Sequence, residues 1–178
     1  MNLIAAADQN WGIGYQGQLL CHVPADLRRF KELTCGKTVV MGRATLESLP
    51  GGRPLPQRRN IVLSSSLEPC GAAQGCQVAV DLPRLFEALS RYDSEDIFII
   101  GGAQLYRDLL PYCRRAYITR LLAAYPADRH LPDLDQLSGW RLTSQSPLQR
   151  HGEISYRYCQ YENAAPLALP KQPWLPQT

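Results

Sequence analysis

A single carboxylate lies within the apolar stripe of a predicted helix, in segment 23–34. Pro24 suits the first helical position, where its missing N–H costs nothing. At about 100° per residue, one face of this helix carries Asp26 together with Val23, Leu27, Phe30, Leu33 and Thr34, and the opposite face carries Arg28, Arg29, Lys31 and Glu32. A carboxylate that points toward a core is costly unless a polar group meets it, so Asp26 is expected to face either another part of the chain or a ligand.

Asp26 also has a purely structural interpretation. It lies in the first turn of the helix, where a negative charge interacts favourably with the helix dipole by about 0.3–1 kcal/mol. Acidic residues are common there, so the choice between the two interpretations depends on the rest of the sequence.

Three predicted strands end in residues that suit a phosphate group. Ile100 is followed by Gly101-Gly102 and a helix start, where the backbone can approach a ligand closely and free N–H groups can meet a pyrophosphate. The other two strand ends carry residues 42–45 (Gly-Arg-Ala-Thr) and 64–66 (three serines). Because ligands gather at the carboxyl ends of parallel strands, these segments predict a ligand with two phosphate sites.

An adenine dinucleotide that carries an extra phosphate would use such an arrangement. Arg43 and Ser65 would favour this phosphorylated form over NAD. The usual G-x-G-x-x-G fingerprint is absent from the sequence.

Short apolar runs alternate with helical patterns along the chain. The pattern predicts an α/β fold, with a single domain, a mostly parallel central sheet, C-terminal antiparallel strands and helices on both faces. The expected strands are 3–7, 38–41, 60–63, 78–80, 97–100, 116–122, 142–146 and 154–161, and the expected helices are 23–34, 44–49, 82–89 (with Asp81 as N-cap) and 103–110.

Composition limits the classes of partner and the compartment. Among 178 residues the formal net charge is +3, and no Lys/Arg run exceeds two, so nucleic acid is not expected. No apolar run approaches the ~18 residues of a membrane span, and the N-terminus does not resemble a signal peptide. An even count of six cysteines is compatible with disulfides, but we expect a cytoplasmic monomer with reduced thiols. Three scattered histidines predict no metal site.

The last part of the chain differs in character. We expect the domain to span residues 1–162 and a proline-rich tail to span 163–178, with Trp174 and Leu175 either docking the tail or forming a partner motif. Residues 67–77 are expected to form a loop.

Taken together and in order, the motifs resemble the dihydrofolate reductase family over about residues 1–161. The matching stretches are Leu3-Ile4-Ala5-Ala6, Ile13-Gly14, Val23-Pro24-Ala25-Asp26-Leu27, Phe30-Lys31, Val40-Met41-Gly42-Arg43, Gly52-Arg53-Pro54-Leu55-Pro56, Arg58-Arg59-Asn60, Leu63-Ser64-Ser65, Ile100-Gly101-Gly102, Tyr106, Tyr117-Ile118-Thr119, Asp128 and Pro132-Asp133. The resemblance implies NADPH-dependent reduction of 7,8-dihydrofolate to 5,6,7,8-tetrahydrofolate by hydride transfer to the pterin.

The resemblance also implies a role for each matching residue on the substrate side. Asp26 would bind the pterin and, with a pKa raised by desolvation, promote protonation of pterin N5 from water, while Thr119 would bind Asp26 and a pterin amine. Cys21 would complete the catalytic group. Arg58 would grip the glutamate carboxylate of the substrate. The apolar walls would be Ile4, Ala5, Ala6, Leu27, Phe30, Leu49, Leu55 and Ile100.

On the cofactor side, the resemblance implies that Arg43 and Ser65 take the 2′-phosphate of NADPH and that Gly101-Gly102 form a cis peptide. Residues 8–23 would form a mobile loop that closes over the nicotinamide, braced by Asp128. The full set of expected cofactor residues is Ala6, Ile13, Gly14, Leu19, Gly42, Arg43, Ala44, Thr45, Leu63, Ser64, Ser65, Gly101, Gly102, Ala103, Gln104, Leu105 and Tyr106.

This chain departs from the family pattern at a few positions. Leu20 and Cys21 stand where the family usually has Pro-Trp. Because a thiol is smaller than an indole and a weaker donor, we expect a wetter or more open pterin pocket and a shifted pH optimum. Gln104 stands where many members carry an arginine near the 2′-phosphate, and Ala44 stands where some carry a histidine, which weakens the expected preference for NADPH over NADH.

Three alternatives to a standard dihydrofolate reductase remain open on the sequence. The first is a pterin or pyrimidine reductase of related fold, of the riboflavin-pathway type, which would not need the Pro24-x-Asp26 helix with Arg58. The second is an antifolate-tolerant variant of the reductase. The third is a non-catalytic nucleotide-binding module.

Overall fold

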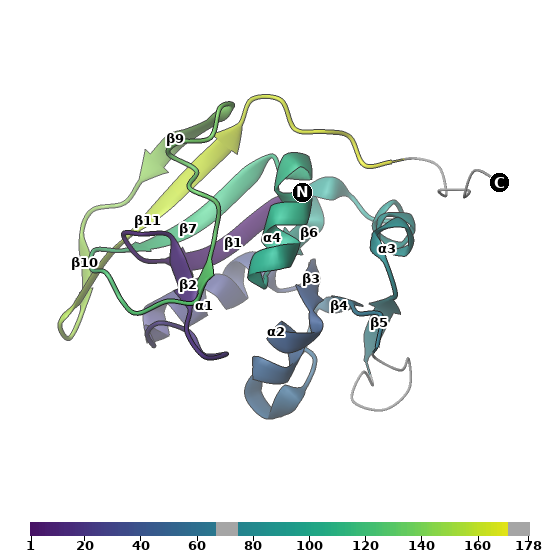
Figure 1. The fold of residues 1–178 in the computed structure, drawn as a ribbon, viewed down its shortest axis with the longest axis horizontal. Coiled ribbons are helices and arrows are strands. Elements are labelled where there is room, and N and C mark those ends of the chain that lie inside the picture. Colours follow the sequence, from purple (N-terminus) through teal and green to yellow (C-terminus); the bar gives the residue numbers. More distant parts are fainter. Residues whose placement is uncertain (67–74, 171–178) are drawn as a thin grey trace.

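A twisted, mostly parallel sheet forms the centre of the molecule (Figure 1). The computed structural model describes residues 1–66 and 75–170. The parallel strands are β1 (Asn2–Ala7), β3 (Thr38–Gly42), β4 (Arg59–Leu63), β5 (Cys76–Ala79), β6 (Ile97–Ile99) and β7 (Arg115–Leu121), in the order β7-β1-β6-β3-β4-β5. The antiparallel strands β9 (Trp140–Gln145), β10 (Gln149–His151) and β11 (Ile154–Asn163) extend the sheet beyond β7.

Helices cover both faces of this sheet. They are α1 (Pro24–Thr34), α2 (Arg43–Ser48), α3 (Leu82–Leu89) and α4 (Ala103–Leu109), with 3₁₀ turns at Pro50–Gly52, Ser94–Asp96 and Leu110–Tyr112. Prolines occupy the first turns of α1 and α3, and the Asp81 side chain caps α3 by accepting from Arg84 N at 2.8 Å. Helices α1 and α3 therefore begin where these residues predict a helix start.

The core is divided by the sheet into two apolar clusters. Side chains of α3 and α4 pack with Leu3 on one face, and side chains of α1 and α2 pack with Ile4 on the other. This division follows from strand geometry, because successive side chains of a strand point to opposite faces. The expected α/β fold is confirmed.

Some details differ from the expectation. The sequence did not predict β10 or the small sheet of β2 (Gly12–Gly14) and β8 (Arg129–His130), because these strands are too short to show a periodic pattern. The expected loop 67–77 was wrong at its end, where Cys76 and Gln77 belong to β5. Its residues 67–74 lie outside the described part of the chain, as do Trp174 and Leu175.

The segment after β11 is fastened to the domain. Ala164 N donates to Gly139 O and Leu167 N donates to Pro111 O, both at 2.9 Å, and Leu169 packs against the core. The first residues of the expected tail are therefore extended chain that is held in place by backbone hydrogen bonds.

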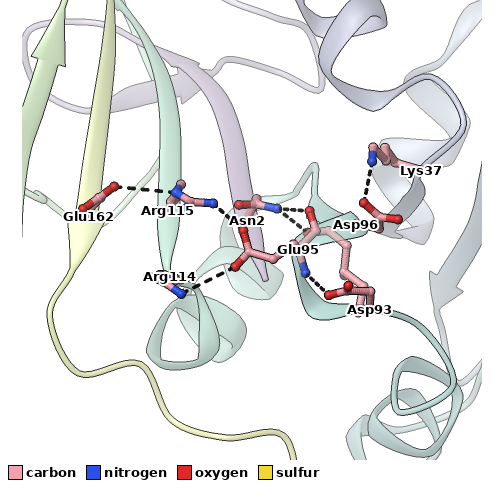
Figure 2. Close-up of polar contacts among 9 residues, drawn as sticks. Asn2, Lys37, Asp93, Glu95, Asp96, Arg114, Arg115 and Glu162 are labelled. Atoms are coloured by element: carbon pink, nitrogen blue, oxygen red, sulfur yellow. Dashed lines mark hydrogen bonds and ion pairs between the residues drawn. The ribbon is translucent and has the colours of Figure 1, made fainter.

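Charged side chains join the amino ends of several strands (Figure 2). Glu95, in the turn before β6, pairs with Arg115 at the start of β7 and lies 3.9 Å from Arg114. Arg115 also reaches Glu162 of β11 at 3.6 Å. The network lies at the opposite end of the sheet from the glycine-rich turns, so it fixes the strands without occupying their carboxyl ends.

Asn2 connects this network to the buried sheet. Asn2 is only 2% exposed. Its Nδ2 donates to the Glu95 carbonyl at 2.8 Å and to the Ile97 carbonyl at 3.4 Å. These bonds tie the start of β1 to the start of β6.

No helix within the described ranges is both long and apolar enough to cross a membrane.

We predict that Asn2→Ala destabilises the fold by about 1–3 kcal/mol, because it leaves carbonyl oxygens at a buried position without their donor. Urea unfolding monitored by circular dichroism measures the loss. Glu162→Gln is the control, since the half-exposed ion pair that it removes contributes about 1 kcal/mol or less. Equal losses in the two variants would contradict the prediction.

Candidate active site

Asp26 lies between helix α1 and strand β7. The first turn of α1 forms as Asp26 N donates to Val23 O at 2.9 Å, and this turn directs the carboxylate toward the sheet. There, Thr119 Oγ1 donates a hydrogen bond to Asp26 Oδ1 at 2.5 Å. Thr119 is 2% exposed and pairs in register with Ala6 on β1 and Tyr158 on β11, so a central strand fixes its position.

The surroundings of Asp26 favour its neutral form. Burial raises the pKa of the Asp26 carboxyl, and the hydrogen bond from Thr119 and the charge of Arg29 act in the opposite direction. Burial also raises the pKa of the Cys21 thiol, and the nearby charge of Asp26 raises it further. An acid that binds a proton more readily than an exposed aspartate therefore lies beside a protonated thiol.

A narrow cavity opens next to this carboxylate. It brings together the three expected catalytic residues and Ala6, Ile13, Leu19 and Leu27 from the expected ligand-binding sets. The complete lining is Ala6, Ile13, Leu19, Leu20, Cys21, His22, Val23, Asp26, Leu27, Thr119 and Leu121. Segment 19–23 of the loop before α1 supplies much of this wall, so the position of the loop determines how much of Asp26 meets solvent.

The other expected apolar residues lie on the same side of the sheet as α1. They belong to a single cluster that comprises Ile4, Phe30, Leu49, Leu55 and Ile100. Ala5 is separate from them, because its side chain packs against the cluster on the opposite face. In the alternating geometry of β1, Ala5 is placed to offer its backbone rather than its methyl group to this side.

Arg58 lines a second cavity, which is wider and more open than the first and which Leu55 also lines. Its Nε donates to Pro56 O at 2.9 Å and its Nη1 donates to Thr34 Oγ1 at 3.2 Å. Asn60 holds the same loop through bonds from its side chain to Leu55 O and Arg58 O, at 2.9 and 3.0 Å. The loop therefore presents a guanidinium group of fixed orientation.

The turns after β3 and β6 contact each other at the carboxyl edge of the sheet. Gly42 N donates to Gly101 O at 2.8 Å, and the Gly101-Gly102 peptide bond is cis. Gly101 has a φ of +114°, and a Cβ at this position would lie 3.3 Å from the Tyr106 ring, so a larger residue would be both strained and crowded. Tyr106 Oη in turn donates to the Ile4 carbonyl at 2.8 Å, which fixes β1 against this turn.

Several expected cofactor residues have side chains that point elsewhere. Ala103, Leu105 and Tyr106 are at most 7% exposed and lie among core residues, because α4 packs this side against the sheet. Gln104 is exposed, and its amide bonds to Asp108 and Arg107 at 2.7 and 2.9 Å.

Arg43 has partners that the sequence did not identify. Its Nε lies 2.8 Å from Glu47 Oε1, and its Nη1 donates to Ser66 Oγ at 3.0 Å. Arg43 and Ser65 are predicted to take the 2′-phosphate together, and the serine that contacts Arg43 in the structure is Ser66. The signal was present in the sequence, since Ser66 is the third serine of the run.

The loop 8–23 is anchored at two points. Asp8 is fully buried, and its carboxylate accepts from the backbone N–H groups of Asn10, Gly12 and Tyr125 at 2.8–2.9 Å. Asp128 Oδ2 accepts from Gln16 N at 3.1 Å, the contact expected between this residue and the loop. Sequence reasoning missed Asp8, because a single acid after a strand carries no distinguishing spacing.

Arg29 was assigned to the solvent face of α1, and that assignment is wrong. The residue is half-buried, with its guanidinium carbon 4.4 Å from the centroid of the Tyr158 ring. A helical wheel places Arg29 at the edge of the Asp26 face, and it cannot show that β11 supplies an aromatic surface there.

The described cysteines are free thiols, namely Cys21, Cys35, Cys76, Cys113 and Cys159. Within residues 1–66 and 75–170, no three His, Cys, Asp or Glu side chains are grouped so that they could hold a metal ion.

The fold and this site define an α/β enzyme with a half-buried acid beside a cavity at the carboxyl edge of its sheet. A family model described as dihydrofolate reductase matches residues 1–163. The chain is 41% identical over 164 residues to the dihydrofolate reductase of Bacillus subtilis, covering 91% of this chain and 94% of that protein. It is 44% identical over 156 residues to dihydrofolate reductase type 3 of Salmonella typhimurium, covering 88% and 92%.

A solved structure shows the same architecture. Dihydrofolate reductase from Enterococcus faecalis, complexed with NADP(H) and RAB-propyl, superposes with a TM-score of 0.78 at 32% identity, covering 91% of this chain and 95% of that one. The chain belongs to the dihydrofolate reductase family.

We predict that Asp26→Asn stabilises the fold at pH 7. The raised pKa of Asp26 means that the folded state binds its proton more tightly than the unfolded state, so stability falls as pH rises from the unfolded pKa through the folded pKa. An asparagine keeps an oxygen that can accept from Thr119 and carries no charge to desolvate.

Urea titrations at several pH values test this expectation. The advantage of Asp26→Asn over the wild type should shrink as pH falls below about 4, where the aspartate is protonated in both states. A variant that is less stable than the wild type at pH 7 and equal to it at pH 3 would contradict the assigned direction.

Proposed function

We propose that this chain catalyses the reduction of 7,8-dihydrofolate to 5,6,7,8-tetrahydrofolate by NADPH. Family membership supports the reaction, and the Asp26–Thr119 pair at the edge of the cavity is the observation that carries it. A riboflavin-pathway reductase of related fold would have no need of this acid, nor of Arg58 in the neighbouring cavity.

On the substrate side, Asp26 orients the pterin. Thr119 occupies Oδ1 of the carboxylate, and Oδ2 is the oxygen proposed to accept from the amino and ring nitrogens of the pterin. The cluster of Ile4, Phe30 and Ile100 offers an apolar surface to flat rings. Arg58, held by its backbone contact to Pro56, is proposed to bind the glutamate carboxylate of the substrate.

Asp26 also promotes the proton transfer that accompanies reduction. The reaction adds a hydride to the pterin and a proton to its N5. We propose that a water molecule delivers this proton and that Asp26 raises the basicity of N5 by hydrogen bonding to the ring. Burial suits this role, because a carboxylate out of bulk water interacts more strongly with a polar ring.

The turns at the carboxyl edge fit a dinucleotide. Gly42 and Gly101-Gly102 lie backbone to backbone and leave no side chain between the two turns, which lets a pyrophosphate approach. Arg43, with Ser66 3.0 Å away and Ser65 adjacent in sequence, is proposed to bind the 2′-phosphate. NADPH, when bound, supplies the hydride. Ala6, Ile13 and Leu19 line the part of the cavity proposed for the nicotinamide, and loop 8–23 excludes water there.

We also propose that residues 1–162 act as a monomeric catalytic unit with residues 163–178 as an attached tail. The family match ends at residue 163 and β11 ends at Asn163, so both support a boundary within one residue of this position.

The proposed reaction predicts that mixing the protein with NADPH and dihydrofolate lowers the absorbance of the reduced nicotinamide. Asp26→Asn should reduce turnover near pH 7 by roughly 100-fold or more, because the protonation step loses its carboxylate. Glu32→Gln, an exposed change on the same helix, is the control and should retain wild-type turnover.

Fluorescence titration with NADPH completes this test. Asp26→Asn should bind NADPH as the wild type does, because Asp26 lies on the substrate side of the cavity. Folded wild-type protein without turnover would favour a non-catalytic module, and loss of NADPH binding in Asp26→Asn would show that Asp26 is misplaced in our proposal.

Cys21 gives a second prediction about the same cavity. Cys21→Trp restores the residue usual in the family, narrows the cavity beside Asp26 and supplies an N–H donor. We expect the variant to have a several-fold lower KM for dihydrofolate and a displaced pH profile of kcat/KM. Steady-state kinetics from pH 5 to 9 measures both, with Leu142→Trp at an exposed position on β9 as the control. An unchanged KM and an unchanged profile would exclude a special role for Cys21.

A further inference from the structure

Arg29 is held on an aromatic surface and is not among the described residues that line the proposed active site. Its guanidinium carbon lies 4.4 Å from the ring centroid of Tyr158 and 5.9 Å from that of Tyr117. Tyr158 lies on β11 and Tyr117 on β7, so two neighbouring strands supply the rings. Contacts of this kind are attractive and restrict the long side chain to one region.

This placement brings Arg29 close to Asp26 without an ion pair. The two residues are three apart on α1, where side chains are neighbours on the helix surface. None of the ion pairs of 4 Å or less between described residues joins them, so Arg29 acts on Asp26 through space. Its charge opposes the effect of burial and lowers the pKa of the Asp26 carboxyl.

The other groups around Asp26 differ from Arg29 in charge. Thr119 on β7 is a neutral donor, Cys21 on the loop is a protonated thiol, and burial raises the pKa of Tyr158 on β11 to about 12, which keeps its phenol neutral. His22 of the loop lines the same cavity. Of these groups, Arg29 is the one with a permanent positive charge.

We propose that Arg29 is a positioning residue of the reductase, whose charge, fixed on the rings of Tyr158 and Tyr117, sets the pH range in which Asp26 works. Within the described part of the chain, Arg29 is not among the residues that line the cavity and no ion pair joins it to Asp26, so it can act on the charge of the carboxylate without occupying the oxygen proposed for the pterin. This inference rests on the proposed function and adds to it a residue that does not touch the substrate.

Arg29→Gln is the direct test, with Arg28→Gln as a matched control one position earlier on the exposed side of the same helix. The chemical shift of the Asp26 carboxyl carbon, followed by NMR from pH 3 to 9 in the NADPH-loaded protein, reports its titration without any need for turnover. We expect the midpoint to rise by roughly 0.5–1 pH unit in Arg29→Gln and to stay within about 0.2 unit of the wild type in Arg28→Gln.

Single-turnover hydride transfer gives the functional readout. In the proposed function Asp26 acts on the pterin as a carboxylate, so the single-turnover rate should change with pH around the Asp26 midpoint. In Arg29→Gln the pH at which this rate changes should therefore rise by the same roughly 0.5–1 pH unit as the NMR midpoint, and in Arg28→Gln it should stay in place.

Tyr158 tests the aromatic part of the proposal. Tyr158→Leu removes the ring and should move the Asp26 midpoint in the same direction as Arg29→Gln, whereas Tyr158→Phe keeps the ring and should retain the wild-type midpoint. Equal midpoints in Tyr158→Leu and Tyr158→Phe would overturn the role of the ring.

The outcomes separate this inference from the proposed function. An unchanged midpoint in Arg29→Gln, or the same shift in Arg28→Gln, overturns the role of Arg29 even where the wild type is an active reductase. A wild type without turnover overturns the proposed reaction, and the NMR titration still decides whether Arg29 controls Asp26. If Arg29 had only a structural role, Arg29→Gln would lower the stability of the fold and leave the Asp26 midpoint unchanged.

Discussion

The hydrogen bond from Thr119 to Asp26 joins a half-buried carboxylate to a central strand of the sheet. Among the described residues that line the cavity, Asp26 is the only acid. A carboxylate removed from water prefers to be neutral, and a carboxylate that is completely satisfied by the protein has nothing to offer a ligand. Thr119 resolves this conflict by occupying one oxygen. Because Thr119 is itself fixed by its pairing with Ala6 and Tyr158, the rigidity of the sheet is passed to a side chain on a helix.

The two ends of the sheet are built for different purposes. At the amino ends, Glu95, Arg115 and Asn2 form ion pairs and buried hydrogen bonds that keep the strands in register. At the carboxyl ends, the turns at Gly42 and Gly101-Gly102 approach each other through backbone atoms alone. Charge is therefore neutralised at the amino ends, and backbone atoms meet at the carboxyl ends, where we propose that the phosphates of NADPH bind.

Sequence reasoning worked best where one local rule was sufficient. Pro24 and Asp81 mark helix starts whatever surrounds them, and the apolar run 97–100 predicts a buried central strand, which the structure has at 97–99. Asp26 stood out because a charge interrupted an apolar stripe. The role of Arg29 could not be read in this way, because it depends on which strand lies opposite. Ala5 and Ser66 were within reach of local rules, since strand alternation places Ala5 on the face opposite Ile4 and Ser66 belongs to the serine run.

Arg29 shows most clearly what the one-dimensional pattern lacks. A helical wheel divides α1 into an apolar face and a solvent face, and Arg29 falls near their border. Strand β11, more than a hundred residues later in the sequence, places the Tyr158 ring at that border. The ring holds the Arg29 side chain, which would otherwise lie on the surface of α1.

The access of solvent to Asp26 also depends on distant parts of the sequence, because the loop before α1 is held in place by them. Its base is fixed by the buried Asp8, and its middle is held by Asp128, so residues 19–23 are brought over Asp26 by contacts that lie outside the cavity. The burial that raises the pKa of Asp26 is therefore partly supplied by a segment whose anchors are hydrogen bonds to backbone N–H groups. A change at either anchor that lets water reach Asp26 removes part of the desolvation, lowers the pKa of the carboxyl and weakens its hold on a flat polar ring. In this chain Arg29 and the loop before α1 thus act on a single quantity, the free energy of charging the Asp26 carboxylate.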